Sequence, residues 1–322
     1  MVESEANEKR QRLIFNLKIL LCLLLLPIVL FAVGLKHILD YLFGSKEKDV
    51  KGKVVLITGG GSGLGKEMAI LLAKKGCKIA VVDVNTKAGN ETIEIISKIP
   101  GAMAKTYRTD VSSYREIQVL AVKIEKDLGP VDILINNAAL MSLNSTPNLK
   151  AEEIERIILV NLGSYILTTK EFLPKMIARK SGHIVAVSSL AGLIALPGAG
   201  IYSATKYAII GFMDCLRAEL RLSDCDFIRT TTAHPYFMKT NAEVYETLND
   251  LGVLSRYPCM SGSYTAEKIV EGILRNERMV YVPKMFALVV WLHRLLPVKW
   301  QDYTLLQFYD STSNKLAQFY WK

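Results

Sequence analysis

Residues 54–83 decide the fold of this chain. They begin with the apolar run Val54-Val55-Leu56-Ile57, which continues directly into the turn Thr58-Gly59-Gly60-Gly61-Ser62-Gly63-Leu64-Gly65. A stretch of helical composition follows, and a second apolar run then ends in Asp83. Short continuous apolar runs are typical of parallel strands that are covered on both faces. The order of strand, glycine turn, helix, strand and acid therefore predicts a βαβ unit that binds a dinucleotide.

The glycines and the acid also indicate how the dinucleotide would bind. Glycines let the turn tighten and let the backbone approach a pyrophosphate, which then lies at the positive end of the helix. Asp83 is placed to accept hydrogen bonds from the adenosine ribose hydroxyls, and its charge would repel a 2′-phosphate. The sequence therefore favours NAD over NADP, although Lys87 lies close enough to keep NADP as the alternative.

Further motifs follow along the chain. Asp110-Val111 closes a third strand region, and Asn136-Asn137-Ala138-Ala139 follows the apolar strand Val131–Ile135. Asn161 lies in Val160-Asn161-Leu162-Gly163, Ser189 precedes Tyr202 by thirteen positions, and Lys206 follows Tyr202 by four. With these motifs and Thr58-Gly59-x-x-x-Gly63-x-Gly65, the chain resembles the short-chain dehydrogenase/reductase family from about Lys51 to Tyr281. It departs from the family's Asn-Asn-Ala-Gly at the last position, where Ala139 stands.

The resemblance implies an α/β fold with a single Rossmann-type, doubly wound parallel sheet and helices on both faces, here preceded by an apolar anchor helix. It implies four catalytic residues, namely Ser189, Tyr202, Lys206 and Asn161. The residues that it implies for cofactor binding are Thr58, Gly59, Ser62, Gly63, Leu64, Gly65, Asp83, Asp110, Val111, Asn137, Ala138, Tyr202, Lys206, Pro235 and Thr240. In the family, the acid at Asp110 contacts the adenine, and the segment from Pro235 to Thr240 lies along the nicotinamide.

The spacing of Tyr202 and Lys206 suits acid–base chemistry on an alcohol. A general base works best with a pKa near neutrality, whereas free tyrosine titrates near 10. Residues four apart on a helix are neighbours, so we expect the Lys206 ammonium, together with the positive nicotinamide ring, to lower the pKa of Tyr202. The Ser189 hydroxyl follows a strand and can hydrogen-bond the substrate oxygen, with Ser188 as the alternative. The resemblance implies that Asn161 supports a chain of water molecules that relays the proton from Lys206. It also implies that Lys206 hydrogen-bonds the nicotinamide ribose.

A narrower resemblance concerns the membrane-associated retinol and 17β-hydroxysteroid dehydrogenases. The chain has an N-terminal hydrophobic segment, the motif Pro235-Tyr236-Phe237-x-x-Thr240, and a Tyr264–Arg275 helix that leads to Val280-Tyr281-Val282-Pro283. This resemblance implies a lipophilic alcohol as substrate, such as retinol, a steroid or a long-chain alcohol. Residues 241–263 are the expected lid over the substrate.

The N-terminal region predicts a membrane anchor. An uncharged run extends from Ile19 to Leu35 and would span about 25 Å as a helix, with a kink at Pro27. A spanning helix, a hairpin or shallow helix, and a cleaved signal peptide ending near Ala32-Val33-Gly34 remain open, as does a buried core helix. Lysines and arginines flank the run on both sides, so they do not set its orientation. We expect a location on the endoplasmic reticulum membrane, on lipid droplets, or on both.

These segments divide the chain into four parts. Residues 1–44 form the polar tail and anchor, 45–52 a charged linker, 53–283 the NAD-binding domain, and 284–322 an apolar extension. Met285 to Leu292 is too short to span a bilayer and is interpreted as a shallow membrane contact, with a dimer or core helix as the alternative.

Composition excludes several classes of protein. Half of the residues are apolar, which excludes a disordered chain, and the formal net charge of +9 is spread without an aromatic platform, which argues against nucleic-acid binding. Five cysteines without a CxxC pair argue against a disulfide framework or a metal site. His183 and His234 are expected to lie at strand ends in structural roles.

The sequence thus predicts an NAD-dependent oxidoreductase that interconverts a lipophilic alcohol and its carbonyl, with Tyr202 as general base or acid. The alternatives are an NADPH-dependent carbonyl reductase and, in another class, a non-catalytic protein that binds lipid surfaces. A homodimer is expected from the resemblance alone.

Overall fold

The computed structural model describes residues 2–43, 46–144, 146–239, 245–246, 249 and 259–309. The chain forms two compact units, Met1–Glu47 and Lys48–Lys322. The first contains one helix, α1 (Val2–Phe43), with Pro27 inside it. Its segment Asn7–Ala32 is apolar and long enough to cross a membrane, and none of it is buried. The finding agrees with the predicted anchor, and a signal sequence would pass the same test.

The second unit is built on one seven-stranded sheet, in which every neighbouring pair of strands is parallel. The strand order is β3-β2-β1-β4-β5-β6-β7. The strands are β1 (Val54–Thr58), β2 (Lys78–Asp83), β3 (Met103–Arg108), β4 (Ile133–Asn136), β5 (Gly182–Val187), β6 (Ile228–Pro235) and β7 (Met279–Val282). The order reverses between β1 and β4, which is where open parallel sheets bind their ligands. The predicted doubly wound α/β fold is confirmed.

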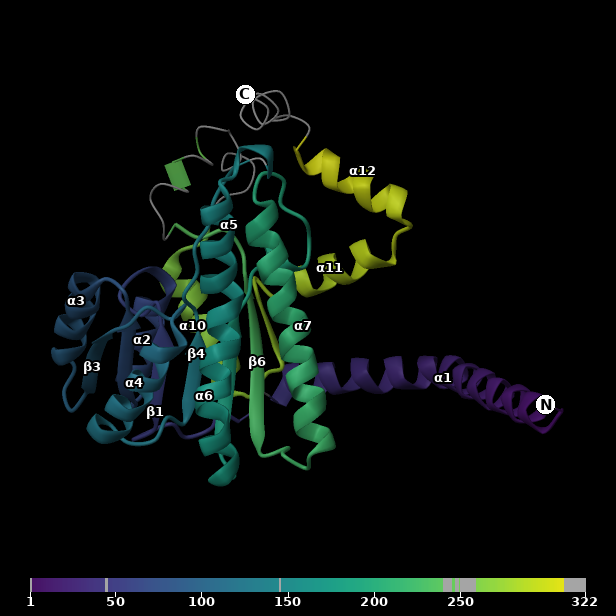
Figure 1. The fold of residues 1–322 in the computed structure, drawn as a ribbon, viewed down its shortest axis with the longest axis horizontal. Helices are drawn as coiled ribbons and strands as arrows, with labels where there is room; N and C mark the ends of the chain where they lie inside the picture. The colour runs from purple at the N-terminus through teal and green to yellow at the C-terminus, as the bar shows by residue number, and fades with distance from the viewer. Residues whose placement is uncertain are drawn as a thin grey trace. The chain divides into compact units, whose positions relative to one another are not determined.

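Helices cover both faces of the sheet, as Figure 1 shows. The helices of this unit are α2 (Gly63–Lys74), α3 (Thr86–Ser97), α4 (Tyr114–Asp127), α5 (Ala151–Ile158), α6 (Ser164–Ala178), α7 (Gly200–Leu222), α10 (Gly262–Leu274), α11 (Phe286–Leu295) and α12 (Val298–Tyr309). Three short turns join them: η1 (Thr146–Asn148), the π-helical turn η2 (Leu159–Gly163) and η3 (Leu190–Gly192).

Each face has its own core. On one face, Ile57 of β1 packs with Met68 of α2 and Ile269 of α10. On the other face, Leu56 packs in a cluster with residues of α4, α6 and α7, including Phe172. Successive residues of a strand point to opposite faces, so a strand that is buried on both sides is apolar throughout. This explains why β1 is recognisable from its sequence as a continuous apolar run.

The compact unit begins at Lys48, within the segment that was expected to be a linker. Its backbone N–H donates to the carbonyl of Leu274, and its amine is hydrogen-bonded to His183 Nδ1 at 2.6 Å and to Asn276 Oδ1 at 3.0 Å. Val50 is buried. Residues 48–52 are therefore packed against the domain through contacts with β5 and with the C-terminal end of α10, both far along the chain.

Both histidines of interest lie at strand ends, as predicted. His183 is the second residue of β5, and its Nε2 is hydrogen-bonded to Thr231 at 2.9 Å. His234 is the penultimate residue of β6, is fully buried, and stacks on the Tyr281 ring with the centroids 5.0 Å apart.

Because α10 packs closely on β7, adding a single methyl group to α10 at Gly272 should destabilise the protein. A Cβ at Gly272 would lie 2.2 Å from Cγ2 of the buried Val280. Gly272→Ala should lower the free energy of unfolding by about 1–3 kcal/mol through overpacking. Gly211 on α7 is the matched control, because a Cβ there meets nothing within 4 Å; Gly211→Ala should stabilise the protein by roughly 0.5–1 kcal/mol. Equal thermal midpoints for the two variants would contradict this packing.

Burial of His234 predicts a pH dependence of stability. Burial lowers the pKa of His234 to about 4. Between pH 6.5 and about 4, His234 therefore binds a proton in the unfolded chain but stays neutral in the folded protein. The free energy of unfolding falls as the pH falls through this range. The difference between the pKa values of His234 in the unfolded and folded states corresponds to a loss of about 3 kcal/mol in the free energy of unfolding. Thermal midpoints of the full chain in detergent should fall less steeply for His234→Phe, which retains the stacking. His183 is a second buried histidine with a lowered pKa, so part of the acid sensitivity should remain.

Candidate functional site

Thr58 and Asn137 fasten the ends of β1 and β4 together at the point where the strand order reverses. The Thr58 hydroxyl accepts hydrogen bonds from the backbone N–H groups of Asn137 at 2.9 Å and Ala138 at 3.1 Å. In return, the Asn137 side-chain amide donates to the carbonyls of Thr58 at 3.0 Å and Gly59 at 3.2 Å. Thr58, Asn137 and Ala138, which are predicted to bind the cofactor, thus also hold together the loops that follow β1 and β4.

The glycine turn leaves no room for other side chains. Gly59 and Gly63 have φ values of +62° and +52°, which glycine adopts without strain. A Cβ at Gly65 would lie 2.1 Å from the carbonyl oxygen of Gly59. Ser62 precedes α2 and makes no side-chain cap hydrogen bond, so its hydroxyl does not occupy the amide groups of the first turn. A helix N-terminus of this kind binds anions, and these residues fit the pyrophosphate of a dinucleotide.

Asp83 lies at the end of β2 beside this turn. One carboxylate oxygen accepts from the Gly61 N–H at 2.9 Å, and the other accepts from the Asn85 N–H at 2.9 Å. The carboxylate is therefore held in place at the rim of the crevice, and each oxygen has further acceptor capacity. Lys87 lies in the first turn of α3.

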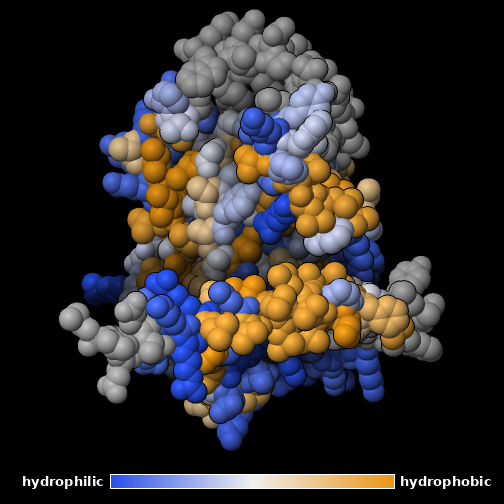
Figure 2. All heavy atoms as spheres, turned by 90° about the vertical axis from the view of Figure 1, so that its right-hand side faces the viewer, coloured by the Kyte–Doolittle hydropathy of each residue, from blue (hydrophilic) through white to orange (hydrophobic). Residues whose placement is uncertain are grey.

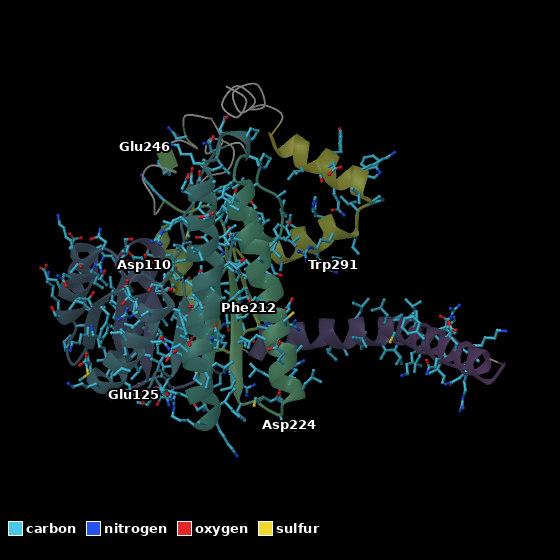
Figure 3. The ribbon with its side chains drawn as sticks, viewed as in Figure 1. Asp110, Glu125, Phe212, Asp224, Glu246 and Trp291 are labelled. Atoms are coloured by element: carbon cyan, nitrogen blue, oxygen red, sulfur yellow. The ribbon has the colours of Figure 1, made fainter. Side chains whose placement is uncertain are left out.

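Asp110 lies one turn beyond the strand it was expected to close, because β3 ends at Arg108. Its carboxylate accepts from the Ser112 N–H at 3.0 Å, a local bond that favours a turn over continued strand, and it pairs with Arg156 at 3.0 Å (Asp110 is labelled in Figure 3). Burial alone would raise the pKa of Asp110, but the bonds from Ser112 and Arg156 lower it. Val111 is buried. Arg156 of α5 was missed in the sequence, since nothing local relates it to Asp110.

Ser189, Tyr202 and Lys206 come together at the carboxyl end of β5. Ser189 follows β5, accepts from the Ala191 N–H at 3.1 Å, and is hydrogen-bonded to the Tyr202 side chain. Lys206 lies one turn after Tyr202 on α7, with its amine 5.5 Å from the centre of the Tyr202 ring. Ser188 is buried and donates to the Lys206 carbonyl at 2.9 Å. Of the two serines, Ser189 is therefore the one that meets Tyr202.

Burial changes the charges expected in this group. Burial raises the pKa of Tyr202, and the Ser189 hydrogen bond acts in the opposite direction. Burial also lowers the pKa of Lys206 to about 7. The sequence-based expectation of a phenol with a lowered pKa counted the nearby charges and left out the desolvation of both groups.

Asn161 is fully buried in the π-helical turn η2 and links the loop at Leu140 to α7. Its side-chain oxygen accepts from the Leu140 N–H at 2.7 Å, and its amide donates to the Leu140 carbonyl at 2.8 Å and to the Thr205 hydroxyl at 3.2 Å. Thr205 donates in turn to the Tyr202 carbonyl at 2.7 Å. Asn161 therefore positions the helix that carries Tyr202 and Lys206. Its expected part in a water chain stays a prediction.

Pro235 ends β6, and the next residue, Tyr236, donates its N–H to the carbonyl of Val282 at 3.0 Å. Thr240 lies outside the described residues, as does most of the expected lid at 241–263. Met238, just before the expected lid, forms an isolated parallel β-bridge with Met260, near the end of the lid.

Comparison with known proteins agrees with this arrangement. Residues 53–249 match the family described as short chain dehydrogenase. Epidermal retinol dehydrogenase 2 of Mus musculus is 34% identical over 265 residues, which cover 82% of this chain and 85% of the relative. Estradiol 17-beta-dehydrogenase 11 of Rattus norvegicus is 32% identical over 286 residues, covering 89% and 94%.

Solved structures point to the same fold. A short chain dehydrogenase/reductase from Burkholderia phymatum in complex with NAD has a TM-score of 0.69 and 26% identity, covering 77% of this chain and 94% of that one. A metagenomic short-chain oxidoreductase in complex with NADP has a TM-score of 0.60 and 24% identity, covering 73% and 98%. With its residues 53–249 matched by the family and these relatives aligned over most of their length, the chain belongs to the short-chain dehydrogenase family of nicotinamide-dependent oxidoreductases, which act on CH–OH groups.

Proposed function

We propose that this protein is a membrane-associated, NAD-dependent oxidoreductase that interconverts a lipophilic alcohol and its carbonyl. The observation that carries the proposal is the group formed by Ser189, Tyr202 and Lys206 at the carboxyl edge of the sheet. This group lies at the same edge as the glycine turn and Asp83. A non-catalytic scaffold would have no physical need for the phenol, the buried amine and the hydroxyl together.

In this proposal, the chain's own groups orient the alcohol and move its proton. When bound, the oxidised nicotinamide accepts the hydride from the carbinol carbon. The Ser189 hydroxyl hydrogen-bonds the substrate oxygen, and the Tyr202 phenolate takes the proton from it. Lys206 has a pKa of about 7 and can exchange a proton with water at neutral pH. In the direction of reduction, Tyr202 returns the proton to the carbonyl oxygen.

The preference for NAD rests on Asp83. Its carboxylate is held beside the turn by the N–H groups of Gly61 and Asn85, where it would accept bonds from ribose hydroxyls and repel a 2′-phosphate. An NADPH-dependent carbonyl reductase remains the alternative, with Lys87 as the candidate cation.

The lipophilic substrate is supported by the named activities of the relatives and by the surface of α11. Val290 is buried and Phe286 stacks on Tyr236 at 5.0 Å, which attaches one side of α11 to the domain. Trp291, which is labelled in Figure 3, is 53% exposed, and Leu295 is 63% exposed. Figure 2 views the side of Figure 1 on which α11 and α12 lie and shows hydrophobic residues gathered in patches on that face. The neighbouring basic residues are Lys284, Arg294 and Lys299.

Such a helix suits the interface of an anionic bilayer, where apolar side chains insert and basic ones stay at the headgroups. We propose that α11 is a shallow membrane contact that acts in addition to the anchor in residues 1–44, and that residues 53–283 form the catalytic domain. The endoplasmic reticulum membrane and the surface of lipid droplets are the proposed locations.

A homodimer is also part of the proposal. An apolar groove of about 550 Å³ runs along α6 and α7 and is lined by residues that include Ile166, Leu173, Ile177, Phe212 and Leu216 (Phe212 is labelled in Figure 3). Covering this groove with the same surface of a second copy would remove it from water.

Replacing Tyr202 tests the function directly. Membranes containing the protein should reduce NAD with at least one of retinol, a 17β-hydroxysteroid and a long-chain alcohol, measured by the absorbance of reduced nicotinamide. Tyr202→Phe removes the hydroxyl that takes the proton in this proposal and should lower turnover by about 10²–10⁴-fold while nucleotide binding and membrane targeting persist. Nucleotide binding by the wild type without turnover of any substrate would favour the non-catalytic lipid-surface protein.

Replacing Asp83 tests the cofactor. Asp83→Ser removes the charge and should lower the ratio of kcat/KM for NAD to that for NADP by about tenfold or more. Glu91 is an exposed carboxylate on α3, the helix that follows Asp83 in the chain. Glu91→Ser makes the same change in net charge and should leave the ratio unaltered. A wild-type preference for NADP would sink the assignment and favour the carbonyl reductase.

A further inference from the structure

Tyr165, the second residue of α6, lies against the candidate catalytic lysine. Its side chain is fully buried, and its hydroxyl donates to the backbone carbonyl of Val187 at 3.0 Å. The same carbonyl accepts the hydrogen bond from the Lys206 amine at 2.9 Å. Val187 ends β5, two residues before Ser189. One carbonyl oxygen thus holds a side chain from α6 and one from α7.

The aromatic ring of Tyr165 also faces this amine. Lys206 Nζ lies 5.5 Å from the centre of the Tyr165 ring and 5.5 Å from the centre of the Tyr202 ring. A cation over the face of an aromatic ring is attracted to it, and the attraction is larger where water is excluded. Because Lys206 is almost fully buried, these rings and the Val187 carbonyl replace much of the hydration that its ammonium form has lost.

We infer that Tyr165 is a positioning residue that holds Lys206 beside Tyr202 and favours its protonated form. The inference rests on the proposed function, in which Lys206 supports the proton transfer at Tyr202. Tyr165 does not act on the substrate. It acts through the lysine, by the ring that faces the amine, while its hydroxyl bond to the Val187 carbonyl fixes where that ring lies.

The groups around Lys206 determine in which direction its titration midpoint should move when the Tyr165 ring is lost. Within the part of the chain that the structure describes, the titratable groups that face it are Tyr165 from α6 and Tyr202 from α7, while β5 contributes the Val187 carbonyl. Burial and the neighbouring Tyr202 raise the pKa of Tyr165 well above its ordinary value, so Tyr165 stays a neutral phenol. Burial of Lys206 lowers its pKa to about 7, and the Tyr165 ring opposes that fall. Loss of the ring should therefore lower the lysine's titration midpoint further.

The test compares Tyr165→Phe with Tyr165→Leu in the full chain in detergent. Lysine labelled with carbon-13 at Cε reports the titration of Lys206, whose signal is assigned by its absence in Lys206→Met. Tyr165→Phe retains the ring and leaves the Val187 carbonyl to Lys206 alone, so its midpoint should stay at or above that of the wild type. The midpoint of Tyr165→Leu should lie about one pH unit below that of Tyr165→Phe. Tyr165→Met, also without a ring, takes the place of Tyr165→Leu if that variant does not fold.

Phe172→Leu is the matched control, because it removes another buried ring from α6 in the same core cluster. Its Lys206 midpoint should equal that of the wild type. Equal midpoints for Tyr165→Phe and the variants without the ring would overturn the inference, as would an equal shift in Phe172→Leu. The titration needs no turnover, so it stands even if the proposed function fails. Where turnover is measured, the midpoint near neutral pH in the dependence of kcat on pH should move to lower pH in Tyr165→Leu. It should not move in Phe172→Leu.

Discussion

The site depends on burying one amine at the carboxyl end of β5. Removing a lysine from water disfavours its charge, which is why the pKa of Lys206 falls to about 7. The fold offsets part of this penalty with the Val187 carbonyl at 2.9 Å and with two phenol rings. The end of β5 and the first turns of α6 and α7 must therefore meet at one place. The Ser188 bond to the Lys206 carbonyl and the Asn161 bond to Thr205 keep them there.

The parts of the fold that could be predicted were those with local signals. A continuous apolar run identified β1 because that strand is buried on both faces. The glycine turn could be located because sterics at Gly59 and Gly65 forbid other residues. By contrast, β3 lies at the edge of the sheet, where exposed residues alternate with partly or fully buried ones, and its end was placed at Asp110-Val111, beyond its last residue, Arg108.

Features that join distant segments were not predictable in this way. The pair of Asp110 with Arg156 and the pair of Tyr165 with Lys206 each connect two separate helices or loops. The spacing of Tyr165, four residues after Asn161, was available as a helical signal, but only the packed structure reveals that its ring meets the lysine. The charge states of Tyr202 and Lys206 depend on burial, which spacing along one helix does not contain. The role of Thr240 remains a prediction, since the residue lies outside the described part of the chain.

The account's central claim is that the chain moves a hydride from an alcohol carbon to a nicotinamide. Incubating the full chain in membranes with NAD and a panel of lipophilic alcohols, each deuterated at the carbinol carbon, tests it by mass spectrometry of the nucleotide. We expect one deuterium in the reduced nucleotide for every carbonyl formed with a substrate of the enzyme. Carbonyl formation without deuterium in the nucleotide, or no product from any alcohol while the nucleotide is bound, would contradict the account.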